Sequence, residues 1–123
     1  MKAYTIADHP FLQSGITRVL FEAFCKEIVN LDGNVQEEFL KHYIAYKAET
    51  SFADVLPQSK QLILHLNIEI NELDDPRGLC RDISHLNHRG NGFVEVKFSS
   101  LDQLPYMVGL SRQALEKQLG DDS

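Results

Sequence analysis

Charged side chains change sign abruptly within the run Asp74-Asp75-Pro76-Arg77-Gly78-Leu79-Cys80-Arg81-Asp82. Residues 77–89 hold three arginines and two histidines but a single acid, and the residues just before them are acidic. A guanidinium group presents its donors as a rigid fork that matches the oxygens of phosphate or carboxylate. Because proline fixes its own φ and glycine permits tight turns, this backbone would hold such groups in place for binding. The segment therefore predicts an anion-binding surface.

The residues expected to contact an anion come from this loop and from one strand that we expect beside it. They are Lys47, Arg77, Arg81, His88 and Arg89. The competing interpretation is local ion pairing, in which Arg77 would pair with Asp74 or Asp75. Arg81 would then pair with Asp82. Exposed pairs of this kind are common and contribute little to stability, so both interpretations stay open until the geometry is known.

Histidine, cysteine and aspartate in the same loop raise the question of metal binding or catalysis. The pair His85-x-x-His88 lies near Cys80 and Asp82, but a structural zinc site needs about four well-placed ligands and has other spacings. A nucleophile built from Cys80 and a histidine would need a lowered thiol pKa and a third, orienting group. The sequence shows neither. We therefore expect no catalytic residue, no metal and no cofactor.

The composition limits the class of partner. The 123 residues carry a net charge of −6, which argues against a uniformly basic nucleic-acid coat and against a membrane-surface binder. Because this charge repels a long duplex, we expect nucleic-acid binding to be weak and strongly salt-dependent. A nucleotide or a short single strand fits that expectation better.

Cysteine usage and hydropathy indicate the compartment. Cys25 and Cys80 are too few for a disulfide framework, so we expect two free thiols in a reducing environment. The first residues contain no apolar h-region, and no stretch approaches the roughly 18 apolar residues of a membrane span. We expect a cytoplasmic protein without a signal peptide.

Apolar residues at three- and four-residue spacing predict two amphipathic helices. The first is expected at about residues 9–31, with Asp8 as its N-cap. The second follows Ser100 and Gln103, which fit a capping box, and it ends at Gly120.

Alternation of apolar and polar residues predicts short strands between the two helices. The clearest alternation lies at residues 62–68, where leucines occupy one face and His65 and Asn67 the other. Further strand-like segments cover residues 35–39, 43–47, 52–56 and 93–98. Gly90-Asn91-Gly92 precedes the last of them and predicts a tight hairpin turn, since it lacks the phosphate-loop pattern.

This order of elements predicts one α+β domain over residues 1–123. We expect two layers, an antiparallel sheet of four to five strands with the N-terminal and C-terminal helices on one face. The predicted core consists of Leu12, Ile16, Val19, Leu20, Phe24, Ile28, Leu62, Leu64, Leu66, Val94, Val96, Leu104, Val108 and Leu115.

Several segments together resemble a bacterial and archaeal family. They are Tyr43-Ile44-Ala45-Tyr46-Lys47, Phe52-x-x-Val55-x-Pro57-Gln58, Leu62-x-Leu64-x-Leu66, the run from Asp74 to Ser84, and Gly90-Asn91-Gly92-x-Val94-Glu95-Val96. The chain is similar to the uncharacterised domain often labelled a predicted transport protein. That domain is found at the C-terminus of restriction-type nuclease proteins with ParB-like or HNH modules. The resemblance covers nearly the whole chain and implies no catalytic residues.

Three classes of function follow from these observations. The resemblance favours a non-catalytic accessory module of a bacterial DNA-restriction or defence protein, which binds nucleic acid, a nucleotide or a protein partner through residues 74–92. A nuclease module is one such partner. The second class is homo-oligomerisation through a strand edge or a sheet face. The third is a small metal-dependent hydrolase that uses the acids and histidines of the loop: Asp74, Asp75, Asp82, His85 and His88.

Overall fold

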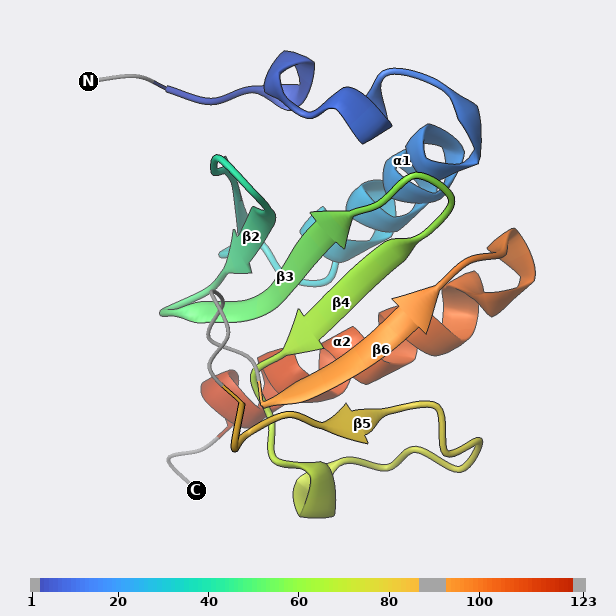
Figure 1. The fold of residues 1–123 in the computed structure, drawn as a ribbon. Helices are drawn as coiled ribbons and strands as arrows, with labels where there is room; N and C mark the ends of the chain where they lie inside the picture. The colour runs from blue at the N-terminus through green and yellow to red at the C-terminus, as the bar shows by residue number, and fades with distance from the viewer. Residues whose placement is uncertain (1–2, 87–92, 121–123) are drawn as a thin grey trace.

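The computed structural model describes residues 3–86 and 93–120 of the chain, in which two α-helices and six strands form (Figure 1). The helices are α1 (Gly15–Val29) and α2 (Leu104–Leu119). The strands are β1 (Gln36–Phe39), β2 (Ile44–Lys47), β3 (Ser51–Pro57), β4 (Leu62–Leu66), β5 (Arg81–Asp82) and β6 (Val94–Phe98). Short 3-10 turns are η1 (Ile6–Asp8), η2 (Pro10–Leu12), η3 (Ile70–Glu72) and η4 (Leu101–Gln103).

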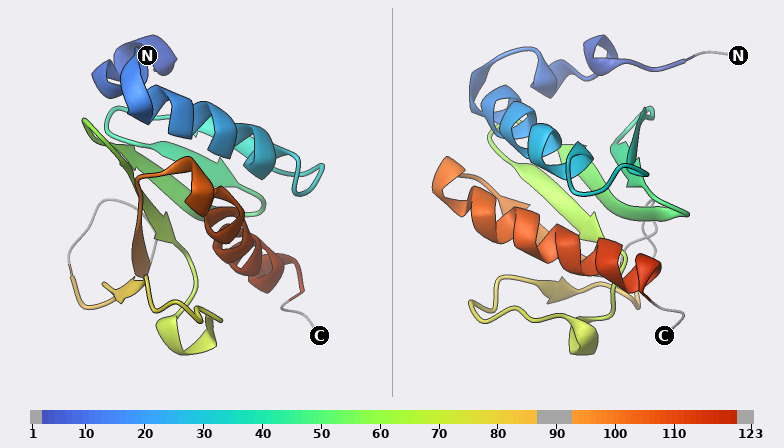
Figure 2. Two further views of the ribbon diagram at one scale, coloured as in Figure 1. Left: turned by 90° about the vertical axis from the view of Figure 1, so that its right-hand side faces the viewer. Right: turned by 180° about the vertical axis from the view of Figure 1, so that it is seen from behind.

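The six strands form one antiparallel sheet in the order β1-β2-β3-β4-β6-β5. Both helices lie side by side on one face of it (Figure 2). The predicted α+β architecture is therefore confirmed. The predicted number of four to five strands was too low because β5 is only two residues long. Pairing with β6 defines this strand, and a segment so short has no alternation to read.

The strand register decides which side chains meet the helices. Leu64 lies opposite Val55 on one side and Val96 on the other, and all three belong to the core between sheet and helices. Aromatic rings fill this layer, with Phe24 of α1 at centroid distances of 6.2 Å from Tyr46 and 6.1 Å from Phe98. Such tilted and edge-on ring pairs stabilise a core beyond simple burial.

The buried stripe of α1 is rotated from the predicted one. Ile16 and Val19 were assigned to the core but are 42% and 45% exposed, whereas Phe21, which was not predicted, is 2% exposed. The stripe is centred on Phe24, and the large ring of Phe21 occupies one flank of it. Ile16 lies on the opposite flank and remains in solvent. Most of the other predicted core residues are buried, and Leu104 is partly buried against the core.

The helix predicted from residue 9 begins later. Residues 6–12 form η1 and η2, and α1 starts after Ser14. Asp8 is therefore not the N-cap of the long helix, and its carboxylate instead accepts the N–H of Thr5 at 2.9 Å in a capping box around η1. Gly15 has a φ of +82°, so the backbone changes direction there, and a helix continuous from residue 9 cannot form.

Two further predictions were a tight turn before β6 and the absence of a membrane span. The hairpin turn predicted at Gly90-Asn91-Gly92 lies outside the described residues. Within residues 3–86 and 93–120, no helix combines the length and apolar character that crossing a bilayer requires.

Candidate functional site

The charged segment predicted as one anion-binding loop is divided in two by its contacts. Residues 72–80, here called the strap, are fastened to α2, whereas the chain after them forms β5 at the sheet edge. The amide side chain of Gln113 accepts the Asp74 N–H at 2.8 Å and donates to the Asp74 carbonyl at 2.9 Å. Lys117 forms an ion pair with Glu72 at 2.9 Å.

The phenol of Tyr106 is the centre of this attachment. Its hydroxyl donates to one carboxylate oxygen of Asp75 and accepts the N–H of Arg77 at 3.0 Å. The other oxygen of Asp75 accepts the N–H of Cys80 at 2.8 Å. Burial acts to raise the pKa of Asp75, but these hydrogen bonds outweigh it and hold the pKa below its usual range. The Arg77 guanidinium lies 4.8 Å from the centre of the Tyr106 ring, a cation–π distance.

Arg81 lies beyond the strap, on the face of the sheet that the helices do not cover, here called the helix-free face. Its Nη2 forms an ion pair with Glu95 Oε1 at 3.1 Å, so the predicted pairing with Asp82 is wrong. The register causes this, because Arg81 lies directly opposite Glu95 and the next side chain points to the other face. Asp82 instead accepts the N–H of Ser84 at 2.9 Å, which lowers the pKa of its carboxyl.

A row of polar side chains crosses the helix-free face from β5 to β3. His65 Nε2 lies 3.1 Å from Glu95 Oε2, so Glu95 stands between His65 and Arg81. Burial acts to raise the pKa of Glu95, but the hydrogen bond from His65 and the charge of Arg81 outweigh it and lower the pKa. Asp54 lies opposite His65 and accepts the Ser51 hydroxyl at 2.7 Å. Asp54 and His65 are only 1% and 6% exposed.

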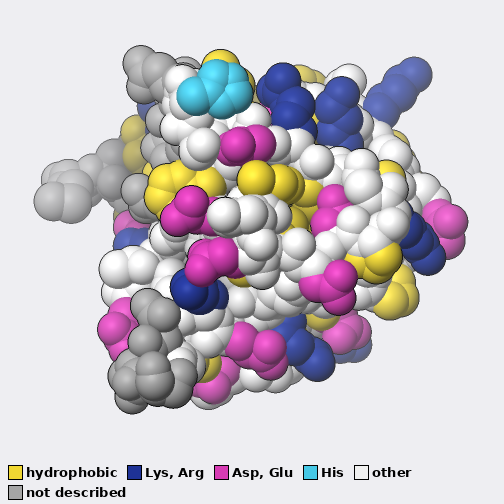
Figure 3. All heavy atoms as spheres, turned by 90° about the horizontal axis from the view of Figure 1, so that it is seen from below, with side chains coloured by type: hydrophobic (Ala, Val, Ile, Leu, Met, Phe, Trp, Pro, Cys, Tyr) yellow, Lys and Arg dark blue, Asp and Glu magenta, His cyan; other side chains and the backbone are white. Residues whose placement is uncertain are grey.

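A hollow of about 600 Å³ lies beside this row, where β6 meets β5; we call it the β5–β6 hollow. Its lining residues are Gln61, Leu79, Arg81, Glu95, Val96, Lys97, Ser99 and Gln103. Arg81 and Lys97 supply two cationic groups, and the side chain of Arg81 is 64% exposed. Seen from below, several lysine and arginine side chains lie along the upper edge of the molecule, and others lie among the acids over the rest of this face (Figure 3).

The structure brings together only part of the predicted anion site. Lys47 lies on β2, where it pairs with Glu38, and β3, β4 and β6 separate it from β5. The prediction that Lys47 lies on a strand neighbouring Arg81 was therefore wrong. Arg77 belongs to the strap and stacks on Tyr106 of α2, and it is not among the residues that line the hollow. His88 and Arg89 lie outside the described residues.

Sequence reasoning missed several residues of the hollow. Lys97 and Ser99 come from β6 and its end, and Gln61 from the start of β4. The alternation over residues 93–98 did place Lys97 and Glu95 together on the polar face of a strand. The pattern could not predict which strand lies beside β6, because β5 has only two residues and shows no alternation.

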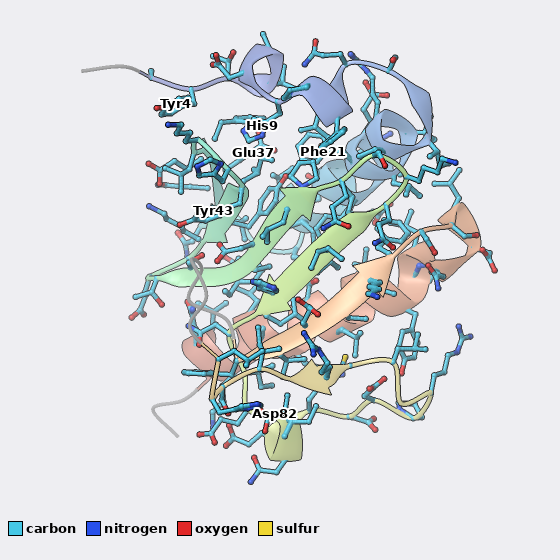
Figure 4. All side chains as sticks on the ribbon, viewed as in Figure 1. Tyr4, His9, Phe21, Glu37, Tyr43 and Asp82 are labelled. Atoms are coloured by element: carbon cyan, nitrogen blue, oxygen red, sulfur yellow. The ribbon has the colours of Figure 1, made fainter. Side chains whose placement is uncertain are left out.

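A second buried histidine lies at the opposite edge of the sheet. His9 is 4% exposed, its Nε2 lies 2.8 Å from the carbonyl oxygen of Leu40, and its ring centroid lies 6.1 Å from that of Phe39. Tyr46 donates its hydroxyl to Glu37 of β1 at 2.8 Å. The contacts of His9 fasten the N-terminal segment to this edge of the sheet, and the Tyr46–Glu37 bond joins β2 to β1. Figure 4 shows this end of the sheet through Tyr4, His9, Phe21, Glu37 and Tyr43, with Asp82 at the other end.

The thiols, acids and histidines were the candidate groups for nucleophilic and metal chemistry. Within residues 3–86 and 93–120, no group of three histidines, cysteines or acids is placed to hold a metal ion. Burial, with acids nearby, raises the pKa of Cys25 to about 11 and that of Cys80 to about 12, the opposite of an activated thiol. The Ser51 hydroxyl donates to Asp54, and His65 bonds to Glu95.

Comparison with known proteins places the chain in a family. Residues 13–117 match the family described as "Domain of unknown function (DUF5655)". The chain belongs to this family. It is also 34% identical, over 116 residues, to an uncharacterized protein of Haemophilus influenzae, in a match that covers 94% of this chain and 38% of the relative. The DUF5655 domain thus spans well under half of that relative's length. No solved structure matches the chain.

Proposed function

We propose that this DUF5655 domain is a non-catalytic accessory module of a bacterial DNA-restriction or defence protein. In this proposal it binds the phosphate of a nucleotide or of a short single-stranded nucleic acid in the β5–β6 hollow. The observation that carries the proposal is the pair of cations, Arg81 and Lys97, on one hollow of the helix-free face. The resemblance to domains fused to restriction-type nucleases supports the cellular setting. The partial coverage of the Haemophilus influenzae relative, 38% of its length, supports a module within a longer protein.

The ion pair of Arg81 leaves it able to bind a phosphate. A guanidinium has five N–H donors, and the contact between Arg81 Nη2 and Glu95 engages one side of the fork. The Glu95 carboxylate also contacts His65, so Arg81 is not its only partner. Lys97 is exposed and adds a second positive charge. Ser99 and Gln61 supply neutral polar groups to the same hollow.

The strap supports binding by holding β5 in place. Tyr106 fixes the strap only a few residues before Arg81, and pairing with β6 fixes the backbone of Arg81 itself. A preorganised guanidinium loses less conformational entropy when it binds an anion than one on a mobile loop. The acids of the strap thus have a positioning role in this proposal.

The small number of cations sets the expected salt dependence. Contacts from Arg81 and Lys97 to two phosphates give a slope of log K against log salt of about −1.4 for a single strand. This slope is shallower than the strong salt dependence expected from the sequence, because among the described residues only Arg81 and Lys97 supply cations to the hollow. Together with the net charge of −6, it predicts weak binding that is measurable at low salt. A long duplex would meet the acidic remainder of the surface.

The test is a titration of fluorescently labelled oligothymidylate and of ATP at low salt. Arg81→Ala and Lys97→Ala should each weaken binding by about tenfold, because each removes a charge-assisted contact. Lys47→Ala is the matched control, since it removes the same charge from a strand that does not reach the hollow. If the wild-type chain does not bind either probe, or if all three variants lose affinity equally, the proposal fails.

A further inference from the structure

The outer surface of the helical layer carries a groove between α1 and α2, with a volume of about 320 Å³. Glu27 of α1 forms one wall. Leu104, Pro105, Val108, Gly109 and Arg112 of α2 line the rest. A second hollow of about 420 Å³ lies between α2 and the residues Leu31 and Asp32, which follow α1, and it shares Arg112 with the first. The two helices run side by side over this length (Figure 2).

Apolar surface extends from the groove along α1. Ile16 and Val19, which are 42% and 45% exposed, lie on the same side of the helix as Ala23 and Glu27, since residues three, four and seven apart share a face. The core of the chain does not use these side chains. Exposed apolar surface beside a groove that has charged walls is typical of a protein–protein contact.

Gly109 is an independent indication that another backbone approaches this groove. A glycine inside a helix costs about 1 kcal/mol relative to alanine. A Cβ at Gly109 would meet nothing within 4 Å, so no neighbour among the described residues requires the glycine. Glycine is favoured where a second chain must come close to a helix backbone.

The two charges of the groove identify the partner. Glu27 and Arg112 stand on opposite walls, both exposed, and among the described residues neither side chain forms an ion pair. A two-fold axis along the groove places α1 of each chain over α2 of the other. Because Glu27 and Arg112 line the same groove, each carboxylate in this arrangement faces a guanidinium of the opposite chain, as a self-complementary interface requires. A partner that carried charges of only one sign would form an ion pair with only one of these two residues.

We propose that a second copy of this chain docks in the groove and forms a two-fold symmetric dimer. Glu27 of each chain pairs with Arg112 of the other, and α1 of each chain packs over the other α2 at Gly109. Ile16 and Val19 become buried at the rim of this contact. The residues that line this groove differ from those that line the β5–β6 hollow.

The test measures the mass of the full chain over a rising concentration series by sedimentation. The wild-type mass should rise from 14.0 kDa toward twice that value. Glu27→Arg and Arg112→Glu should each raise the dimer dissociation constant at least about tenfold, because like charges then face each other. An equimolar mixture of the two single variants should recover the affinity, since every pair in the mixed dimer is again opposite in charge. The double variant, which keeps the net charge, should recover it as well.

A bulky residue at Gly109 distinguishes a loss of dimer formation from a loss of folding. Gly109→Gln should keep or raise the melting temperature seen by circular dichroism, because the Cβ enters open space in a helix. It should abolish the dimer by blocking the approach of the partner helix. A wild-type chain that stays monomeric at millimolar concentration, or charge reversals that leave the dimer unchanged, would overturn the proposal. So would a Gly109→Gln variant that dimerises like the wild type.

Discussion

Tyr106 of α2 donates its hydroxyl to Asp75 of the strap, a residue 31 positions earlier in the chain. The same oxygen accepts the Arg77 N–H, and Asp75 also accepts the Cys80 N–H. One pair of side chains therefore sets the path by which the chain reaches β5. The acidic half of the charged run makes the contacts that hold the strap on α2, while Arg81 lies beyond the strap.

Removing the Tyr106 hydroxyl should loosen the strap. Tyr106→Phe keeps the ring but leaves the Arg77 N–H and one Asp75 oxygen without this partner, which should cost about 1–3 kcal/mol of unfolding free energy. Urea unfolding measures the difference. Tyr43→Phe is the control, because no hydrogen bond of the Tyr43 hydroxyl is found among the described residues. Equal stability of both variants would contradict the role of Tyr106.

Ionised Glu95 should stabilise the fold in a defined pH range. Its pKa is lowered in the folded state, so the stabilisation is present above the unfolded value of about 4.3 and is lost as the pH falls through the folded value. Glu95→Gln should therefore be less stable than the wild type at pH 7, by about 1 kcal/mol, and the difference should shrink below about pH 4. Glu49→Gln removes the same charge at an exposed site. A difference that is constant from pH 7 to pH 3 would rule out the linkage.

The two thiols should react slowly in the folded protein. The thiolate is the reactive form, and the pKa values of about 11 for Cys25 and about 12 for Cys80 lie at least two units above the ordinary value of 9.0. At pH 8 the reaction with Ellman's reagent should therefore be slower by about 100-fold or more than in urea. The single variants Cys25→Ser and Cys80→Ser show which kinetic phase of this reaction belongs to which thiol. A fast native phase would show that one thiol is activated.

Gly78 should tolerate a side chain poorly although space is available. Its φ is +63°, and a Cβ there would meet nothing within 4 Å, so the cost of alanine is backbone strain alone. Gly78→Ala should lower the unfolding free energy by about 1–2 kcal/mol. Gly33→Ala provides the comparison, because that glycine also faces open space but does not have a positive φ. Similar losses at both positions in urea unfolding would refute the strain argument.

The fold could be predicted from the sequence because its long elements carry strong periodic patterns. The alternation at Leu62, Leu64 and Leu66 assigned the strand and the face that packs against the core correctly, but Ile63 and His65 on the other face are buried as well. The start of α1 could not be placed because Asp8, the predicted cap, belongs to the capping box of the short turn η1. The positive φ of Gly15 separates the long helix from the residues before it, and a hydrophobic pattern does not report backbone conformation.

The candidate site was harder to predict because it depends on pairing between strands. Arg81 was singled out by its charge, but its partner Glu95 lies 14 residues away, on the strand that β5 joins. Lys47 was grouped with Arg81 because both are cations near predicted strands. Only the strand order shows that they lie near opposite edges of the sheet.

The strand order has a consequence for how the chain is made. The four strands from β1 to β4 pair in the order of synthesis, each with the strand just completed. In contrast, β5 can pair only after β6 has been synthesised, and the strap can bond to α2 only after Gln113 has been synthesised. On the ribosome, the charged run therefore emerges well before the surface that receives it. A nascent chain or a truncation that stops before α2 exposes this segment to proteases, and full resistance appears only when the last helix is complete.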